Sequence, residues 1–300
     1  MTNEEYDFIL FDRIEKIKQI DKELNLQNNS FIAFSGGKDS TVLHYLIDLA
    51  LPNNNIPRVF QNTGIEYSDI RKFVKEISKN DNRIIILKSN VNIKEMLNKY
   101  GYPFKSKEHS LKLYYFKKGT NSKKIKDYFN RIGYIKCPKN LLYQTKKNFD
   151  LKISDKCCLK LKKEPQTKWA KENKKSIVIT GIKREEKGQR EKANCLSNHN
   201  THFNPLVPIS EEFENEFIKR NNIRLCKLYY PPYNFKRTGC KGCPFNLNLQ
   251  QDLEIMEQLL PNERKQCDLI WHKVYDEYKR IGFRLKERQT TIFDFIEENK

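Results

Sequence analysis

Two groups of residues in this 300-residue chain have side-chain types and spacings that favour a chemical role, the first in binding an anion and the second in metal or sulfur chemistry. The first is the run SGGKDS at 35–40, which lies between a short apolar run and a helical pattern. Glycines let the backbone turn tightly and bring its amides toward a ligand, and a helix N-terminus adds unsatisfied N–H groups. Lys38 adds a cation, while Ser35 and Ser40 add hydroxyl groups. The run predicts an anion-binding loop. It is not the P-loop of kinases and GTPases, because the GxxxxGK[ST] spacing is absent. An ordinary Gly-Gly turn before a capped helix is the alternative.

The second group is formed by cysteines. Cys157 and Cys158 are adjacent, and a Cys-x-x-Cys motif, Cys240 to Cys243, follows about eighty residues later. Reduced thiols in a cell interior suggest metal or sulfur chemistry rather than disulfides. Four thiolates satisfy an iron-sulfur cluster, whereas zinc ribbons usually use two Cys-x-x-Cys pairs. Zinc and unligated thiols remain alternatives. The other four cysteines lack ligand-like spacing and are expected to be buried: Cys137, Cys195, Cys226 and Cys267.

Positive charge is concentrated in one segment. The chain has 57 Lys and Arg against 38 Asp and Glu, a net charge of +19, and residues 99–175 alone carry 23 basic against 6 acidic residues. Aromatic residues are interleaved with these lysines: Tyr100, Tyr102, Phe104, Tyr114, Tyr115, Phe116, Tyr128, Phe129, Tyr134 and Trp169. Basic groups neutralise phosphates and rings stack on unpaired bases, so the segment predicts contact with DNA or tRNA. A solvated, lysine-rich surface is the alternative.

Alternating strands and helices must position these residues. Apolar runs predict strands at 31–35, 58–61, 84–87 and 176–180, with helices at 3–24, 41–50 and about 69–78. This alternation indicates an α/β fold with a parallel sheet flanked by helices, in which ligands bind beyond the carboxyl ends of the strands. Helical spacing at 249–260 and 263–281 predicts a smaller helical C-terminal module.

The length and composition set the domain expectations. We expect a nucleotide-binding domain at 1–225, with a basic insertion at about 105–155, and a Cys-x-x-Cys and helical module at 226–300. A mean hydropathy of -0.80 without a long apolar run excludes an integral membrane protein. The acidic N-terminus shows no secretory signal, so a cytoplasmic location without membrane association is expected.

Four motifs carry a resemblance to a known family. SGGKDS at 35–40 resembles the PP-loop of the ATP pyrophosphatases. NTGIE at 62–66, TGIKREE at 180–186 and NPL at 204–206 resemble the DTG, TGIRxxES and NPL segments of the phosphoadenosine phosphosulfate reductases and their relatives, with Ile209 where a Trp is common. The resemblance covers most of the chain outside the insertion. It implies an adenine nucleotide alpha-hydrolase-like fold with a mononucleotide site.

The resemblance also implies roles for particular residues. The adenine nucleotide would be held by Ser35, Gly36, Gly37, Lys38, Asp39, Ser40, Asn62, Thr63, Gly64, Glu66, Gly181, Lys183 and Arg184. The residues expected to act in catalysis are Lys38, Asp39, Arg184 and Arg190, with Asp39 or Glu66 holding Mg2+. The cysteine pattern resembles the ligand set of assimilatory adenylylsulfate reductases, which implies a 4Fe-4S cluster on Cys157, Cys158, Cys240 and Cys243.

Three functions compete under this resemblance. The preferred one is a PP-loop sulfurtransferase that binds ATP, adenylates a nucleic acid and transfers sulfur from a donor such as a cysteine desulfurase. The second is a sulfonucleotide reductase, which the absence of the family's C-terminal ECGLH cysteine disfavours. The third is a non-catalytic nucleotide and iron-sulfur module acting with DNA-associated proteins. Gln289 to Phe293 resembles the short peptides that dock on the replication sliding clamp.

Overall fold

The computed structural model of the chain describes residues 1–89, 91–186 and 191–286. The chain forms two compact units, each built from two separate stretches of sequence. The first comprises residues 1–90 and 160–240, and the second comprises residues 91–159 and 241–300. The basic insertion and the C-terminal helices thus belong to the same unit, although more than eighty residues of the first unit separate them in sequence.

The first unit is built on a six-stranded sheet in the order β3-β2-β1-β4-β6-β5. Its strands are β1 (Ser30–Phe34), β2 (Arg58–Asn62), β3 (Ile84–Lys88), β4 (Ile177–Ile179), β5 (Leu196–Ser197) and β6 (His202–Phe203). β5 and β6 pair antiparallel, and the other described neighbours pair parallel. The strand order reverses direction at β1, which creates a topological switch point between β1 and β4. The predicted α/β fold with a parallel sheet is confirmed.

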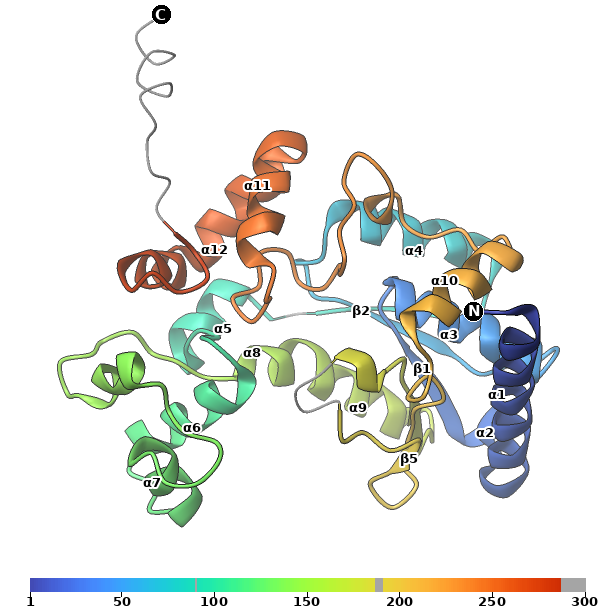
Figure 1. The fold of residues 1–300 in the computed structure, drawn as a ribbon, viewed down its shortest axis with the longest axis horizontal. Helices are drawn as coiled ribbons and strands as arrows, with labels where there is room; N and C mark the ends of the chain where they lie inside the picture. The colour runs from blue at the N-terminus through green and yellow to red at the C-terminus, as the bar shows by residue number, and fades with distance from the viewer. Residues whose placement is uncertain (90, 187–190, 287–300) are drawn as a thin grey trace, which may run out of the picture. The chain divides into compact units, whose positions relative to one another are not determined.

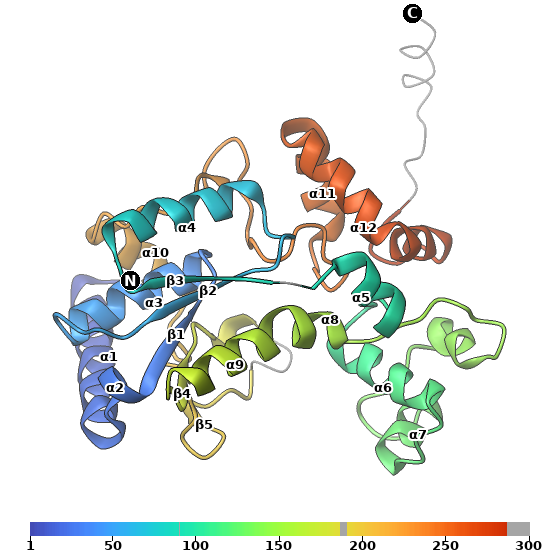
Figure 2. The ribbon, with the colours of Figure 1, turned by 180° about the vertical axis from the view of Figure 1, so that it is seen from behind.

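Helices cover both faces of this sheet. Figure 2 shows α4 on one side of β2 and β3 and α9 on the other. Phe31, Val59 and Ala170 form a cluster on the α9 face, and Trp169 packs edge-on against Phe31. The helical elements are α1 (Asn3–Leu24), α2 (Leu26–Asn29), α3 (Lys38–Ala50), α4 (Ser68–Asn80), α9 (Glu164–Glu172), η3 (Arg184–Glu186), α10 (Glu211–Arg220) and η5 (Lys227–Tyr229). The four predicted strands and the three predicted helices of this half are present with small shifts at their ends.

The second unit is helical (Figure 1). Its elements are α5 (Ile93–Tyr100), α6 (Lys107–Lys117), α7 (Lys123–Phe129), η1 (Lys139–Thr145), α8 (Lys156–Cys158), α11 (Leu249–Leu259) and α12 (Pro261–Arg280). A π-helical turn, η2 (Leu159–Lys163), spans the passage from this unit into the first. Phe104 and Tyr278 pack together in the interior, with ring centroids 4.7 Å apart. The basic insertion is therefore part of a folded body with its own apolar core.

No helix among the described residues is long and apolar enough to cross a membrane.

Candidate functional site

The SGGKDS loop joins β1 to α3 and turns on Gly36. Gly36 has a φ of +69°, and a Cβ there would lie 2.7 Å from Val74 Cγ2, so only glycine fits. The amides of Ser35, Gly37 and Lys38 each donate to a hydroxyl oxygen, on Ser40, Ser35 and Tyr229 respectively. A hydroxyl oxygen is a neutral acceptor that a phosphate oxygen can replace. The loop therefore presents converging donors at the start of a helix, as an anion site requires.

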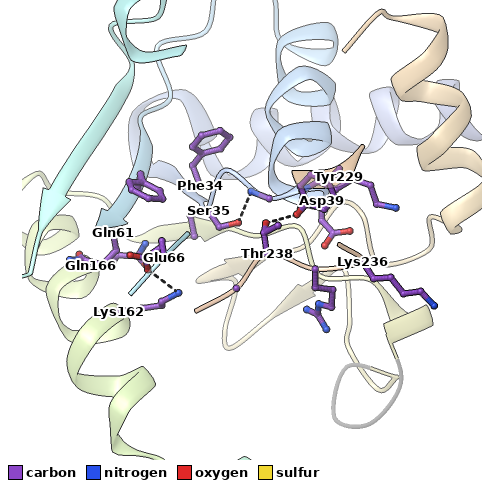
Figure 3. A pocket seen from close by; sticks show the side chains of 16 residues that line it. Phe34, Ser35, Asp39, Gln61, Glu66, Lys162, Gln166, Tyr229, Lys236 and Thr238 are labelled. Atoms are coloured by element: carbon purple, nitrogen blue, oxygen red, sulfur yellow. Dashed lines mark hydrogen bonds and ion pairs between the residues drawn. The ribbon is translucent and has the colours of Figure 1, made fainter. Parts of the chain in front are cut away.

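A cavity of about 270 Å³ opens beside this loop within the first unit. Its lining includes Ser35, Gly37, Lys38 and Asp39 from the loop. Three further basic residues also line it: Lys162, Lys236 and Arg237. Figure 3 shows Gln61, Gln166 and Lys162 on one side of Ser35 and Asp39, Tyr229 and Lys236 on the other. The two glutamine amides and Lys236 therefore lie on opposite sides of the loop.

Lys38 is held by two carboxylates of α10. Its ammonium lies 3.1 Å from Glu211 Oε1 and 3.3 Å from Glu214 Oε2. Lys183, on the loop after β4, contacts the same Glu214 at 2.5 Å and Asp39 at 3.0 Å, and it is only 5% exposed. Lys183 therefore holds the start of α3 through Asp39 and is not among the residues that line the cavity.

Glu214 is the most deeply buried charged group of this network. It is fully buried, and its Oε1 has no hydrogen-bond partner among the described residues. Burial and the neighbouring Asp39 carboxylate raise the pKa of Glu214 to about 7, against the opposing effect of Lys183 and Lys38. Burial lowers the pKa of Lys183, but the carboxylates of Asp39 and Glu214 outweigh it and raise the pKa overall. Sequence reasoning missed Glu214, which lies in the first turn of α10, the helix after the NPL motif.

Gln61 is a second buried group that sequence reasoning missed. It is 4% exposed and lines the cavity, yet neither its Nε2 nor its Oε1 has a hydrogen-bond partner within the described chain. Phe34 and Phe60 are in register, so the next residues, Ser35 and Gln61, lie beside each other at the carboxyl edge of the sheet. A buried amide without partners is costly, and a native structure usually reserves it for a ligand or an ordered water.

The NTGIE segment after β2 is an internally bonded turn. The Thr63 amide and hydroxyl donate to the two Glu66 carboxylate oxygens at 2.9 and 2.7 Å, and the Gly64 amide donates to Asn62 Oδ1 at 3.1 Å. Gly64 has a φ of +84°. Glu66 also lies 3.5 Å from Lys162 Nζ. Glu66 thus lines the cavity but is occupied in shaping the turn.

The loop after β4 approaches the start of α3 closely. A Cβ on Gly181 would lie 3.0 Å from the Asp39 carbonyl oxygen, so glycine permits this approach. Arg184 is exposed, and its Nε donates to the Ala193 carbonyl at 3.1 Å. Arg184 does not line the described cavity. Arg190 lies outside the described residues.

Tyr229 and Thr238, which come about 190 to 200 residues later in the sequence, support the SGGKDS loop through side-chain hydrogen bonds. The Tyr229 hydroxyl accepts the Lys38 amide at 3.0 Å and lies 2.6 Å from Thr238 Oγ1. Burial raises the pKa of Tyr229 to about 12, so the phenol stays protonated. Thr238 and its neighbour Arg237 both line the cavity.

The two cysteine motifs differ in their local support. Cys157 is buried in α8, and its sulfur lies 4.0 Å from that of Cys158. Gly242, inside the Cys-x-x-Cys motif, has a φ of +60° and packs against α12 so tightly that a Cβ would collide with Tyr275 and Cys267. Side chains of α12 bind the backbone carbonyls of this turn: Trp271 to Lys241, Tyr275 to Gly242 and Tyr278 to Pro244.

No group of three or more His, Cys, Asp or Glu side chains in the described residues is arranged to hold a metal ion. Cys157, Cys158 and Cys243 belong to the second unit, and Cys240 is the last residue of the first. The four thiols have the donor chemistry of an iron-sulfur site. Asp39 and Glu66, the two candidates for Mg2+, are both paired with lysines. Each of these two carboxylates would have to release or share its lysine to hold Mg2+.

The remaining cysteines behave as expected with one exception. Cys137, Cys226 and Cys267 are buried, while Cys195 is half-buried. Burial raises the pKa of Cys267 to about 12, which makes its thiol inert near neutral pH.

The aromatic residues of the basic segment divide into two groups. Tyr102, Phe104, Tyr128 and Phe129 are buried in the second unit, and Trp169 packs on the sheet, so these rings serve the fold. The partly or fully accessible rings are Tyr100, Tyr114, Tyr115, Phe116, Tyr134, Tyr143 and Phe149.

Comparison with known proteins gives consistent matches. A family model described as the phosphoadenosine phosphosulfate reductase domain matches residues 29–135 and 132–246. An uncharacterised protein of Methanocaldococcus jannaschii is 25% identical over 288 residues, which cover 91% of this chain and 55% of that protein. The chain thus spans about half the length of this curated relative.

Three solved structures are similar at 14% sequence identity. A phosphoadenylyl-sulfate reductase from Candida auris in a phosphate complex has a TM-score of 0.41, covering 76% of this chain and 91% of that one. An FMN adenylyltransferase from Candida glabrata has a TM-score of 0.43, covering 73% and 58%. The U34-tRNA thiolase NcsA from Methanococcus maripaludis, with its 4Fe-4S cluster, has a TM-score of 0.39, covering 95% and 83%.

Proposed function

The chain belongs to the phosphoadenosine phosphosulfate reductase domain family, and on this premise we propose that it binds ATP at residues 35–40 and adenylates an acceptor for sulfur transfer. The observation that carries the nucleotide assignment is the orphaned amide of Gln61 beside the phosphate-type loop. A carboxamide presents one donor and one acceptor side by side, which matches an edge of adenine. The base would lie at the Gln61 end of the cavity and the phosphates at the loop.

Lys38 would take a new partner when the nucleotide binds. Its ammonium is paired with Glu211, which is exposed, and with Glu214, which is buried. Phosphate oxygens would compete with these carboxylates, while Lys236 and Arg237 supply further positive charge at the cavity wall. Preorganised cations of this kind stabilise negative charge that develops on the phosphates in the transition state.

The proposed reaction has two steps. An oxygen of the acceptor attacks the α-phosphorus of ATP, so that an acceptor-AMP bond forms and pyrophosphate leaves. A sulfur nucleophile then attacks the activated centre and AMP leaves. Lys38, with Arg184 and Arg190, is proposed to neutralise the phosphates, and Asp39 is proposed to fix Lys183 and the start of α3.

An iron-sulfur cluster remains part of this proposal. Cys157, Cys158, Cys240 and Cys243 would hold a 4Fe-4S cluster, whose iron and sulfide would supply sulfur or redox chemistry near the acceptor. The support is the donor set and the rigid turn around Gly242. A cysteine desulfurase-type protein is proposed as the sulfur donor.

The proposed acceptor is a nucleic acid, DNA or tRNA. The support is the charge of residues 99–175 and the accessible rings among them. Such a protein would work in the cytoplasm. Docking of Gln289 to Phe293 on a sliding clamp also stays a proposal, since these residues lie outside the described part of the chain.

A sulfonucleotide reductase is the second candidate function, favoured by the family match alone. It needs a reactive cysteine near the bound sulfonucleotide. Cys267, the last cysteine in the sequence, is buried in α12 with a pKa raised to about 12, which argues against that role.

The nucleotide proposal is tested by binding measurements on Gln61→Leu and Lys38→Ala. Calorimetry with ATP should show roughly tenfold weaker binding for Gln61→Leu, because two hydrogen bonds to the base are lost. Inorganic tripolyphosphate, which has no base, should bind Gln61→Leu like the wild type and bind Lys38→Ala more weakly. Equal affinity of wild type and Gln61→Leu for ATP would overturn the placement of the base.

The cluster proposal is tested by iron and sulfide analysis after anaerobic purification, with absorption near 400 nm. Wild type should contain both elements, and a Cys157→Ser/Cys243→Ser variant should lose them. A wild-type protein without iron and acid-labile sulfide would refute the cluster.

A further inference from the structure

The second unit contains a cavity of its own, of about 260 Å³. It lies between the ends of α5 and α6 and the segment 149–153, all in the basic insertion and its flanks. Its floor is apolar, formed by Leu113, Leu151 and Ile153. Three rings and four lysines complete the lining: Tyr100, Tyr114, Phe149, Lys99, Lys117, Lys118 and Lys152. Asp150 is the one carboxylate in this lining.

Backbone pairing fixes the floor of this cavity. The Tyr102 amide donates to the Lys152 carbonyl at 2.8 Å, and the Ser154 amide donates to the Tyr102 carbonyl at 2.9 Å. Gly101 has a φ of +102°, and a Cβ there would lie 2.8 Å from the Lys152 carbonyl group. Segments about fifty residues apart in the chain are therefore held in close contact, so the cavity is built into the fold.

Three lysine ammonium groups lie over the faces of the aromatic rings in this cavity. Lys118 Nζ lies 4.7 Å from the centroid of the Tyr114 ring, Lys99 Nζ lies 5.3 Å from that of Tyr100, and Lys117 Nζ lies 5.7 Å from that of Phe149. Lys99 and Lys118 are exposed, so their ammonium groups can leave the rings for a competing anion, whereas the ammonium of Lys117 also donates to the carbonyls of Lys146 and Phe149. Ring faces combined with mobile cations form a surface that accepts a flat group carrying a phosphate.

We propose that this cavity binds an unstacked base of a single-stranded nucleic acid, with the surrounding lysines on the adjoining phosphates. The inference rests on the proposed function, since it gives the nucleic-acid acceptor a binding site. A base inside a duplex is covered by its neighbours and its partner, so it can enter only after being extruded. The site therefore selects single-stranded segments or loops over duplexes.

The test is fluorescence anisotropy with a labelled mixed-sequence oligonucleotide, as single-stranded RNA, single-stranded DNA and the matching duplex. The wild type should prefer single strands, and the RNA and DNA arms identify which of them is bound better. Tyr114→Ala should weaken single-strand binding about tenfold, because a stacking platform is lost. Tyr114→Phe keeps the ring and should bind like the wild type.

Matched controls come from the same unit. Tyr134 is fully exposed and outside the cavity, so Tyr134→Ala should leave affinity unchanged. Lys118→Glu should cost more affinity than Lys124→Glu, which alters an exposed lysine of α7 outside the lining. Equal losses within either pair, or equal affinity for duplex and single strand, would overturn the proposal in favour of a diffuse basic surface.

A second readout reports the base itself. An oligonucleotide with a single 2-aminopurine should lose fluorescence on binding the wild type and Tyr114→Phe, and lose less on binding Tyr114→Ala. ATP binding by the same variants should equal that of the wild type. If oligonucleotides bind as described but no ATP-dependent pyrophosphate release occurs, the proposed reaction fails and the binding site stands. If pyrophosphate is released but Tyr114→Ala binds oligonucleotides normally, the site fails alone.

Discussion

Lys38 shows how a residue that is easily read from sequence acquires its properties from distant ones. Its position in SGGKDS predicts a phosphate ligand, but the carboxylates that hold it, Glu211 and Glu214, come from α10, more than 170 residues later. Glu214 is buried against both Lys38 and Lys183. The affinity of the loop for anions therefore depends on the ionisation of one buried carboxyl group.

This dependence gives a pH prediction. With a pKa raised to about 7, Glu214 is largely protonated at pH 6 and ionised at pH 8, so Lys38 loses effective positive charge as the pH rises. ATP affinity should fall between pH 6 and 8 in the wild type, and the fall should be smaller in Glu214→Gln. Calorimetric titrations at both pH values measure the ATP affinity of the two proteins. Protonation of ATP itself affects both proteins equally, so it cancels when their changes in affinity are compared.

Glu211→Gln provides the matched control. Glu211 is exposed and contacts the same ammonium, and its hydrogen bond to Lys38 lowers its pKa, so it stays ionised over this range. Its variant should shift affinity by the same factor at pH 6 and pH 8. A pH profile of Glu214→Gln that follows the wild type would rule out Glu214 as the controlling group.

Close backbone contacts between helices, strands and loops decide where the two cavities form. Gly36 brings the SGGKDS loop against α4, and Gly181 brings the loop after β4 against α3. Gly101 does the same in the second unit, where it packs on the backbone of Lys152 and Ile153, two residues that line the cavity there. The motifs of the first unit could be recognised from sequence, whereas Gly101 lies in a segment without a recognisable motif.

Substitution of Gly101 tests this contact. Gly101→Ala combines a strained positive φ with a backbone collision, so it should lower the free energy of unfolding by about 2 kcal/mol or more. Gly119→Ala is the control, because Gly119 also has a positive φ of +76° but no atom lies within 4 Å of its Cβ position. Urea denaturation should show a clearly smaller loss for Gly119→Ala. Equal losses would mean that backbone conformation alone, and not the contact with Lys152, makes Gly101 necessary.

At the scale of the whole molecule, each unit contains one buried neutral histidine. Burial lowers the pKa of His44 in the first unit and of His109 in the second to about 4. His109 is fully buried between Tyr128 and Gln144, at 2.9 and 2.8 Å from their side-chain oxygens. Burial disfavours the charged form of both imidazoles, and His44 Nδ1 must also stay unprotonated to accept the hydrogen bond from Arg58 Nε.

These histidines should make the protein sensitive to acid. Because the folded pKa lies below the unfolded value near 6.5, the unfolded chain binds more protons, and stability is lost as the pH falls from about 6.5 toward 4. Each histidine contributes a slope of about 1 kcal/mol per pH unit in this window. Asp252 and Glu214, with raised pKa values, act in the opposite direction. Urea denaturation of wild type and His109→Gln from pH 7 to 4.5 should show a shallower loss in the variant; parallel curves would contradict the assignment.

Many strands and loops of the first unit could be predicted because short, contiguous sequence patterns specify them. Apolar runs gave the strands, and SGGKDS, NTGIE and TGIKREE marked the loops at their carboxyl ends. Gln61 and Glu214 could not be selected, because a glutamine in a strand and a glutamate in a helix have no distinctive local pattern until the fold buries them. The same limit applies to the basic segment, where sequence could not separate core rings such as Phe104 from accessible ones such as Tyr114.

The proposed function requires that ATP is cleaved at its α-phosphorus to activate an acceptor. The most direct measurement follows the products of ATP labelled in the α-phosphate, in the presence of single-stranded RNA or DNA, with adenylylsulfate plus thioredoxin as a parallel substrate. We predict that pyrophosphate is released and the label joins the nucleic acid, that the label appears as AMP only after a sulfur donor is added, and that Lys38→Ala abolishes both, with no sulfite from adenylylsulfate. Sulfite release without pyrophosphate formation from ATP would contradict this prediction and identify the protein as a reductase.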